Sequence, residues 1–142
     1  MNRIRPIAIC LFRHHDRILV AEGYDPVKNE AFYRPLGGGI EFGEYSEQTI
    51  ERELQEEIGA EVCDLKYLGT LENIFVFNGS PGHEIVQVFD GSLKDAQFYE
   101  QTVILGQEAD IEGTFRAVWK HIDEFGEGKA TLYPTGLLEM LR

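Results

Sequence analysis

Three glutamates close together in the sequence could bind a cation. Glu53, Glu56 and Glu57 fall near the C-terminal end of a predicted helix. Carboxylates three or four residues apart are neighbours on a helix surface, and each like-charged pair costs roughly 0.2–0.5 kcal/mol. The negative end of the helix dipole adds to that cost. Because Arg52 is the only basic residue of this helix, we expect a cation from outside the chain, and a divalent metal is the simplest candidate.

The helix that positions these glutamates is predicted to run from Ser46 to Ile58. Ser46 is a suitable N-cap residue, and Gly59 is a suitable residue to end the helix. At about 100° per residue, Ile50, Leu54 and Ile58 form an apolar stripe along the helix. The three glutamates fall directly beside that stripe. We therefore expect them to border the core, as in a groove, instead of facing solvent.

A run of three glycines, Gly37–Gly39, precedes this helix and allows the backbone to approach a ligand or a metal closely. The glycines follow a short extended segment at 32–35, because the residue before a proline is biased away from the helical region. Two roles stay open for its side chains. Arg34 could contact a phosphate or be a surface charge, and Tyr33 or Phe32 could stack on a base or pack in the core.

Length and composition limit the class of protein. A chain of 142 residues with 43% hydrophobic and 27% charged residues is expected to form one globular domain over 1–142. No apolar run approaches the roughly 18 residues of a membrane span. Thirteen basic against 25 acidic residues give a net charge of −12, which argues against a nucleic-acid polymer as partner. Cys10 and Cys63 are expected to be free thiols of a cytoplasmic protein.

The remaining pattern predicts several strands and a second helix. The predicted strands are 5–13, 17–22, 61–77 with a break near Gly69, 83–93 and 114–122. Residues 23–31 are predicted to form a loop that could act as a functional lid. A turn at 78–82 is expected to join two antiparallel strands, and a closing helix is expected to begin at Pro134. Strands and helices in mixed order indicate an α/β sandwich with a mixed β-sheet.

One stretch resembles a known family motif. Gly38, Glu44 and the segment Arg52–Gly59, followed by Ala60, stand at the spacing of the Nudix box. Every charged and glycine position of that 23-residue pattern is present, whereas the family usually has a larger residue than Ala60 at the final position. The resemblance implies the Nudix α/β/α sandwich. It also implies hydrolysis, assisted by Mg²⁺ or Mn²⁺, of a nucleoside diphosphate linked to another group.

The resemblance also implies roles for single residues. By position, Glu53, Glu56 and Glu57 would be the metal ligands and catalytic residues, with the backbone carbonyl of Gly38 as a further ligand. Arg52 would pair with Glu44 and fix the geometry of the loop and the helix.

The sequence offers several candidates for the general base. Glu112 lies near the position where some members place an additional acidic ligand or base, and Glu108 and Asp110 of the same loop compete with it. Glu84, at the start of a strand, is a further candidate. The expected partner is a small nucleotide or nucleotide sugar, and homodimerisation is possible. The rival hypothesis is a catalytically inactive Nudix-like module that senses nucleotides.

Overall fold

The structure is a computed structural model that describes residues 2–108 and 113–141. Its strands are β1 (Ile4–His14), β2 (Arg17–Asp25), β3 (Glu30–Gly39), β4 (Val62–Phe77), β5 (Ser80–Leu93), β6 (Val103–Gln107), β7 (Thr114–His121) and β8 (Thr131–Leu132). Its helices are α1 (Ser46–Ile58) and α2 (Leu137–Leu141), with short 3₁₀ turns η1 (Ala96–Tyr99) and η2 (Ile122–Glu124).

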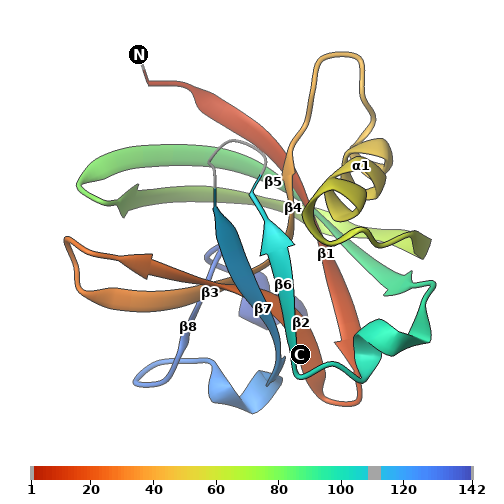
Figure 1. The fold of residues 1–142 in the computed structure, drawn as a ribbon. Coiled ribbons are helices and arrows are strands. Elements are labelled where there is room, and N and C mark those ends of the chain that lie inside the picture. The colour runs from red at the N-terminus through yellow and green to blue at the C-terminus, as the bar shows by residue number, and fades with distance from the viewer. Residues whose placement is uncertain (1, 109–112, 142) are drawn as a thin grey trace.

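The strands form a mixed sheet in the order β4-β5-β1-β3-β2-β7-β6, with β8 beside β3 (Figure 1). β1 pairs in parallel with β5, and β3 in parallel with β8, whereas β1 and β3 are antiparallel. The C-terminal end of β1 also pairs with β2, where Arg13 and His14 lie opposite Ile18 and Arg17. The prediction of a mixed sheet is confirmed.

Successive residues of β1 point to opposite faces of the sheet and bury two apolar clusters. On one face, Ala8, Cys10 and Phe12 pack with Ile50 and Leu54 of α1. On the other face, Ile7, Ile9 and Leu11 pack with Leu137 and Leu141 of α2. A helix therefore covers each face, which confirms the α/β/α sandwich.

Helix α1 has the predicted bounds, but its N-cap lies one residue earlier than predicted. Gly59 adopts a left-handed φ of 68°, and its N–H donates to the carbonyl of Gln55 at 3.0 Å. At the other end the N-cap is Tyr45 and not Ser46. The Tyr45 N–H donates to Oε1 of Gln48 at 2.8 Å, so a side chain of the first turn satisfies the N–H of the N-cap residue.

The predicted loop over 23–31 is wrong. β2 continues to Asp25 and β3 begins at Glu30, so the two strands form a hairpin with a short turn. Asp25 stabilises this turn because its Oδ1 accepts from the N–H groups of Val27 and Lys28 at 3.0 and 3.2 Å. The turn residues that indicated a long loop mark only the end of the hairpin.

Asp25 also joins two hairpins. Its Oδ2 accepts from the backbone N–H of Asn78, at the turn between β4 and β5, at 3.1 Å. Figure 1 shows both hairpins extending to the same side of the molecule. Asp25 is 2% exposed, so this contact is shielded from solvent.

Several other boundaries differ from those predicted. β4 is one continuous strand and not two pieces, but one of its two register shifts, between Tyr67 and Gly69, lies at the predicted break; the other lies between Cys63 and Lys66. The hairpin of β4 and β5 is confirmed, whereas β6 and β8 were not predicted. The closing helix α2 begins at Leu137, three residues after Pro134. Within the part of the chain that the structure describes, no helix is long and apolar enough to cross a membrane.

Candidate metal and catalytic site

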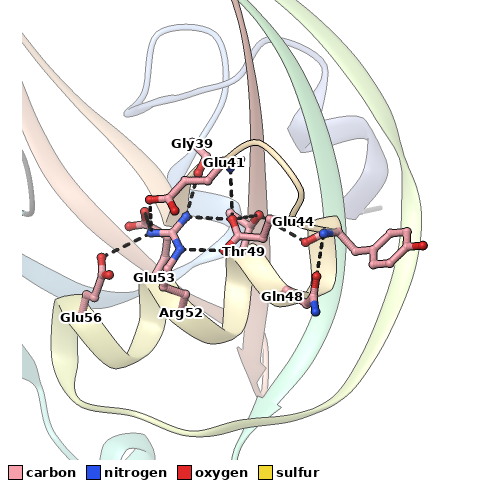
Figure 2. A network of polar contacts seen from close by, with 9 residues as sticks. Gly39, Glu41, Glu44, Gln48, Thr49, Arg52, Glu53 and Glu56 are labelled. Atoms are coloured by element: carbon pink, nitrogen blue, oxygen red, sulfur yellow. Dashed lines mark hydrogen bonds and ion pairs between the residues drawn. The ribbon is translucent and has the colours of Figure 1, made fainter.

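Arg52 is the centre of a polar network between α1 and the end of β3 (Figure 2). Its Nε and Nη2 donate to the two carboxylate oxygens of Glu44 at 2.8 and 2.9 Å. Nη2 also donates to the Gly39 carbonyl at 2.9 Å, and Nη1 donates to Glu53 Oε1 at 2.8 Å. The pairing of Arg52 with Glu44 is therefore bidentate and ties the loop to the helix.

Glu44 receives further hydrogen bonds that hold it ionised. Thr49 Oγ1 donates to Oε1 of Glu44 at 2.6 Å, and the N–H of Glu41 donates to the same oxygen at 3.2 Å. The hydrogen bonds from Arg52 and then from Thr49 lower the pKa of Glu44 to about 2. Thr49 is fully buried. No pattern in the sequence singled out Thr49, although it stands five residues after Glu44 on the helix that Arg52 occupies.

Two glycines of β3 are required for different reasons. Gly37 has a φ of 151°, and a Cβ built on it would lie 2.1 Å from the carbonyl oxygen of Ala8. A Cβ on Gly38 would lie 2.5 Å from Cδ of Glu53 and 2.7 Å from each of its carboxylate oxygens. Gly37 therefore lets β3 approach β1, and Gly38 leaves room for the Glu53 carboxylate.

The pKa of the Glu57 carboxyl group is strongly raised. Burial is the main cause that raises its pKa to about 8, and the negative charge of Glu53 adds to the shift, as does Glu108 more weakly. Arg34 and the backbone N–H of Gly37 act in the opposite direction. Within the described residues, the buried Oε1 of Glu57 has no hydrogen-bond partner. A buried carboxylate oxygen without a hydrogen-bond partner is energetically costly unless a donor or a cation binds to it.

Glu53 and Glu56 complete the cluster but differ in exposure. The Glu53 side chain is 12% exposed and the Glu56 side chain 44% exposed. Arg52 Nη1 contacts both, at 2.8 and 3.4 Å. Over residues 2–108 and 113–141, no three acidic, histidine or cysteine side chains already converge on one point as metal ligands would.

The donor set nevertheless fits a hard divalent cation. All of the candidate ligand atoms are oxygens, which Mg²⁺ prefers. The unpartnered Oε1 of Glu57 is the atom that most needs a cation. Arg52 Nη1 neutralises Glu53 and Glu56 in this arrangement, so a bound metal would share or replace that interaction.

Arg34 and Tyr33 lie on opposite faces of the sheet. Arg34 is exposed and close enough to Glu57 to oppose the rise in its pKa. Tyr33 packs against the cluster under α2, with its ring edge-on to Phe125 at 5.9 Å and beneath Nζ of Lys120 at 4.6 Å. The structure thus brings Arg34 together with the glutamates and places Tyr33 away from them.

The candidates for the general base lie in different parts of the structure. Glu108 lies near enough to Glu57 to affect its pKa. Glu84 lies on the face covered by α2, since Val86 and Val88 of the same strand face pack there. Glu112 and Asp110 fall outside the described residues. Of the described candidates, only Glu108 is thus brought near the glutamates of α1.

Comparisons with known proteins agree with this fold. The NUDIX domain family model matches residues 1–137. The chain is 30% identical over 118 residues to the NAD-capped RNA hydrolase NudC of Haemophilus influenzae (strain PittGG), covering 83% of this chain and 39% of that protein. It is 38% identical over 68 residues to NudC of Pseudomonas aeruginosa (strain LESB58), covering 48% of this chain and 24% of the relative. The chain thus spans less than half the length of these curated relatives.

A solved structure gives the same result for the fold. The NUDIX hydrolase from Nitrosomonas europaea superposes with a TM-score of 0.65 at 20% sequence identity, over 98% of this chain and 86% of that chain. Together with the family match, this shows that the chain belongs to the Nudix family. The resemblance inferred from the sequence motif is confirmed.

Proposed function

We propose that this protein is a hydrolase that cleaves the phosphoanhydride bond of a small nucleoside diphosphate derivative with the help of Mg²⁺ or Mn²⁺. The observation that carries the proposal is the state of Glu57: its buried Oε1 has no partner among the described residues, and its pKa is raised to about 8. Burying a carboxylate in this way is unfavourable without a cation. Binding a metal would relieve that cost.

The proposed ligands are the carboxylates of Glu53, Glu56 and Glu57 and the backbone carbonyl of Gly38. When bound, the metal would supply charge neutralisation on the phosphate oxygens and activate a water molecule. Arg52 would keep Glu53 and the β3 backbone in place through its contacts at 2.8 and 2.9 Å. In the reaction, the water would lose a proton to the general base as its oxygen bonds to phosphorus. The bond from phosphorus to the bridging oxygen would break, and the leaving phosphate would keep that oxygen with its electron pair.

Arg34 is proposed to bind a phosphate of the substrate. It is exposed and lies on the same face of the sheet as Glu57, whose pKa its charge lowers. A guanidinium next to carboxylates that hold a metal would contact the phosphate oxygens that the metal does not reach. Glu112 is proposed as the general base, as the family resemblance suggests, with Glu108 as the competing candidate. Tyr33 stays a proposed substrate contact.

The substrate is proposed to be a nucleoside triphosphate or a nucleotide sugar. The relatives named NAD-capped RNA hydrolase favour a second candidate, a dinucleotide in which a pyrophosphate joins two nucleosides. The net charge of −12 supports a small substrate over a nucleic-acid polymer. We also propose that the protein resides in the cytoplasm, forms one domain over 1–142 and self-associates as a homodimer.

A screen of hydrolysis tests the proposal. Nucleoside triphosphates, nucleotide sugars, ADP-ribose, dinucleoside polyphosphates and NAD are each incubated with the protein and Mg²⁺ or Mn²⁺, and the products are separated by chromatography. We expect cleavage of at least one of these classes and its loss with EDTA. Binding without cleavage in every class would favour the alternative, an inactive nucleotide-sensing module.

A further inference from the structure

Thr49 is a buried polar residue of α1 that the proposed mechanism does not use. Its Oγ1 lies 2.6 Å from Oε1 of Glu44 (Figure 2) and 3.3 Å from the carbonyl oxygen of Tyr45. A hydroxyl group has one proton to donate, and the Tyr45 carbonyl already accepts from the N–H of Thr49 at 3.0 Å. The hydroxyl proton therefore serves the shorter contact, which is the one with Glu44.

Thr49 is the rigid donor among those that reach Glu44. Oε1 of Glu44 also accepts from Nη2 of Arg52 at 2.9 Å and from the N–H of Glu41 at 3.2 Å. Within the part of the chain described by the structure, Thr49 and Arg52 are the only side chains that donate to this carboxylate. Arginine is long and flexible, whereas a β-branched side chain in a helix has few rotamers. The orientation of the Glu44 carboxylate is therefore fixed chiefly by Thr49.

The orientation of Glu44 matters because several carboxylates share one guanidinium. Nε and Nη2 of Arg52 both donate to Glu44, at 2.8 and 2.9 Å. Nη1 lies 2.8 Å from Glu53, 3.4 Å from Glu56 and 3.6 Å from Glu41. One positive charge thus faces four negative groups, and two of these groups are proposed metal ligands. A guanidinium released from Glu44 would turn toward Glu53 and Glu56.

We infer that Thr49 is a positioning residue, whose hydroxyl holds Glu44 so that two nitrogens of Arg52 stay directed away from the proposed metal ligands. Without this hydroxyl, Arg52 would compete with the metal for Glu53, and the affinity for the metal would fall. Residues that orient metal ligands from behind typically change metal affinity by about 10–100-fold when they are replaced. This inference rests on the proposed function, because it concerns the metal of the proposed reaction.

Two variants of Thr49 separate the hydroxyl from the shape of the side chain. Thr49→Val keeps the shape and removes the hydroxyl, whereas Thr49→Ser keeps the hydroxyl. In a calorimetric titration with Mn²⁺, Thr49→Val should bind roughly 10-fold more weakly than the wild-type protein, and Thr49→Ser should bind within about 3-fold of it. Equal affinities in the wild-type protein and Thr49→Val would overturn the inference. A loss in Thr49→Ser as large as that in Thr49→Val would also overturn it.

Ile50→Val is the matched control for a loss of stability. Ile50 is the next residue of α1, is fully buried and packs in the core cluster between α1 and the sheet. Removing one methylene group there should lower the midpoint of urea unfolding and leave the affinity for Mn²⁺ unchanged. If Ile50→Val weakened Mn²⁺ binding as much as Thr49→Val, the effect would come from stability and the inference would be wrong.

A measurement in EDTA separates the inference from the proposed function. Nuclear magnetic resonance follows the exchange with solvent of the Arg52 Nε proton, which is donated to Glu44. This exchange should be roughly 10-fold faster in Thr49→Val than in the wild-type protein, and Thr49→Ser should restore the slow rate. Unchanged exchange in Thr49→Val would overturn the inference alone. Faster exchange in Thr49→Val, together with no Mn²⁺ binding by the wild-type protein, would count against the proposed function alone.

Discussion

The carboxylate of Glu53 occupies the space that a side chain at position 38 would need. A Cβ on Gly38 would lie 2.5 Å from Cδ of Glu53, so the absence of a side chain at one residue sets the position of another. The same strand contributes the Gly39 carbonyl, which accepts from Arg52. The glycine run thus lets the strand backbone lie next to the carboxylates of Glu53 and Glu57.

Gly38→Ala should therefore reduce activity more than stability. The new methyl group would displace the flexible end of Glu53, and Gly→Ala at a compatible backbone position stabilises by about 0.4–1 kcal/mol through the unfolded state. We expect hydrolysis to fall at least about 10-fold, while the free energy of unfolding in urea changes by less than about 1 kcal/mol. Gly69→Ala is the control, because its Cβ would meet only the terminal methyl of Met140 at 3.1 Å. Unchanged hydrolysis in Gly38→Ala would contradict this role.

Removing one proposed ligand should abolish most of the activity. Glu56→Gln or Glu57→Gln should lower kcat by roughly 100-fold or more, because a neutral amide binds Mg²⁺ poorly, with the circular dichroism spectrum unchanged. Glu51→Gln, on the exposed outer part of the same helix, should retain activity. Parent-like kcat in both ligand variants would show that the metal assignment is wrong.

Without metal, the buried carboxylate of Glu57 should make the free energy of unfolding depend on pH. Its pKa rises from an ordinary 4.5 to about 8 on folding, so between these values the folded state binds more protons than the unfolded state. The free energy of unfolding should therefore fall as pH rises through this window. Glu57→Gln should remove that fall and be more stable than the parent at pH 8, by an amount on the order of a few kcal/mol. Parallel pH profiles of urea unfolding in EDTA would contradict the assignment.

The bidentate pair of Arg52 and Glu44 should stabilise the fold. Lysine cannot reproduce the two parallel hydrogen bonds, so Arg52→Lys should lower the free energy of unfolding by about 2 kcal/mol. Arg13→Lys is the matched control, since Arg13 makes a single ion pair with Asp90 at 3.0 Å and is 35% exposed. It should cost less than about 1 kcal/mol. An equal loss in both variants would mean that the bidentate geometry contributes nothing special.

Asp25→Asn should separate the tips of the two hairpins. Burial alone would raise the pKa of Asp25, but hydrogen bonds from the N–H groups of Lys28, Asn78 and Val27 outweigh it and hold the pKa below its usual range. The stabilisation is thus present above the unfolded pKa and is lost as pH falls through the folded pKa. We expect a lower melting temperature at pH 7 and a smaller difference in acid. Asp123→Asn, with a side chain 84% exposed, should match the parent at both pH values.

The elements that the sequence predicted best are those with a local physical signal. Gly59 ended α1 as expected because a left-handed residue at that position suits glycine. The apolar run at 5–13 predicted a buried strand, the stripe of Ile50 and Leu54 predicted a helix that faces the core, and the mixed order of strands and helices predicted the sandwich. The resemblance to the family added the roles of the glutamates, which periodicity alone could not assign.

The features that were missed depend on contacts between distant residues. Residues 23–31 contain Gly, Asp, Pro and Asn, yet Phe32 covers Gly23 across the hairpin, where a Cβ would lie 2.4 Å from the ring. This cross-strand contact overrides the local turn signal. The contact of Asp25 with Asn78 spans 53 residues, and no pattern along the chain indicates it.

The central claim is that the glutamates of α1 bind a divalent metal. Titration of Mn²⁺ followed by electron paramagnetic resonance measures this directly, in the wild-type protein and in Glu57→Gln. We predict specific Mn²⁺ binding by the wild-type protein that strengthens as pH rises through about 8, and an affinity at least about 10-fold weaker in the variant. Equal affinity in the two proteins, or no binding by the wild-type protein, would contradict the account.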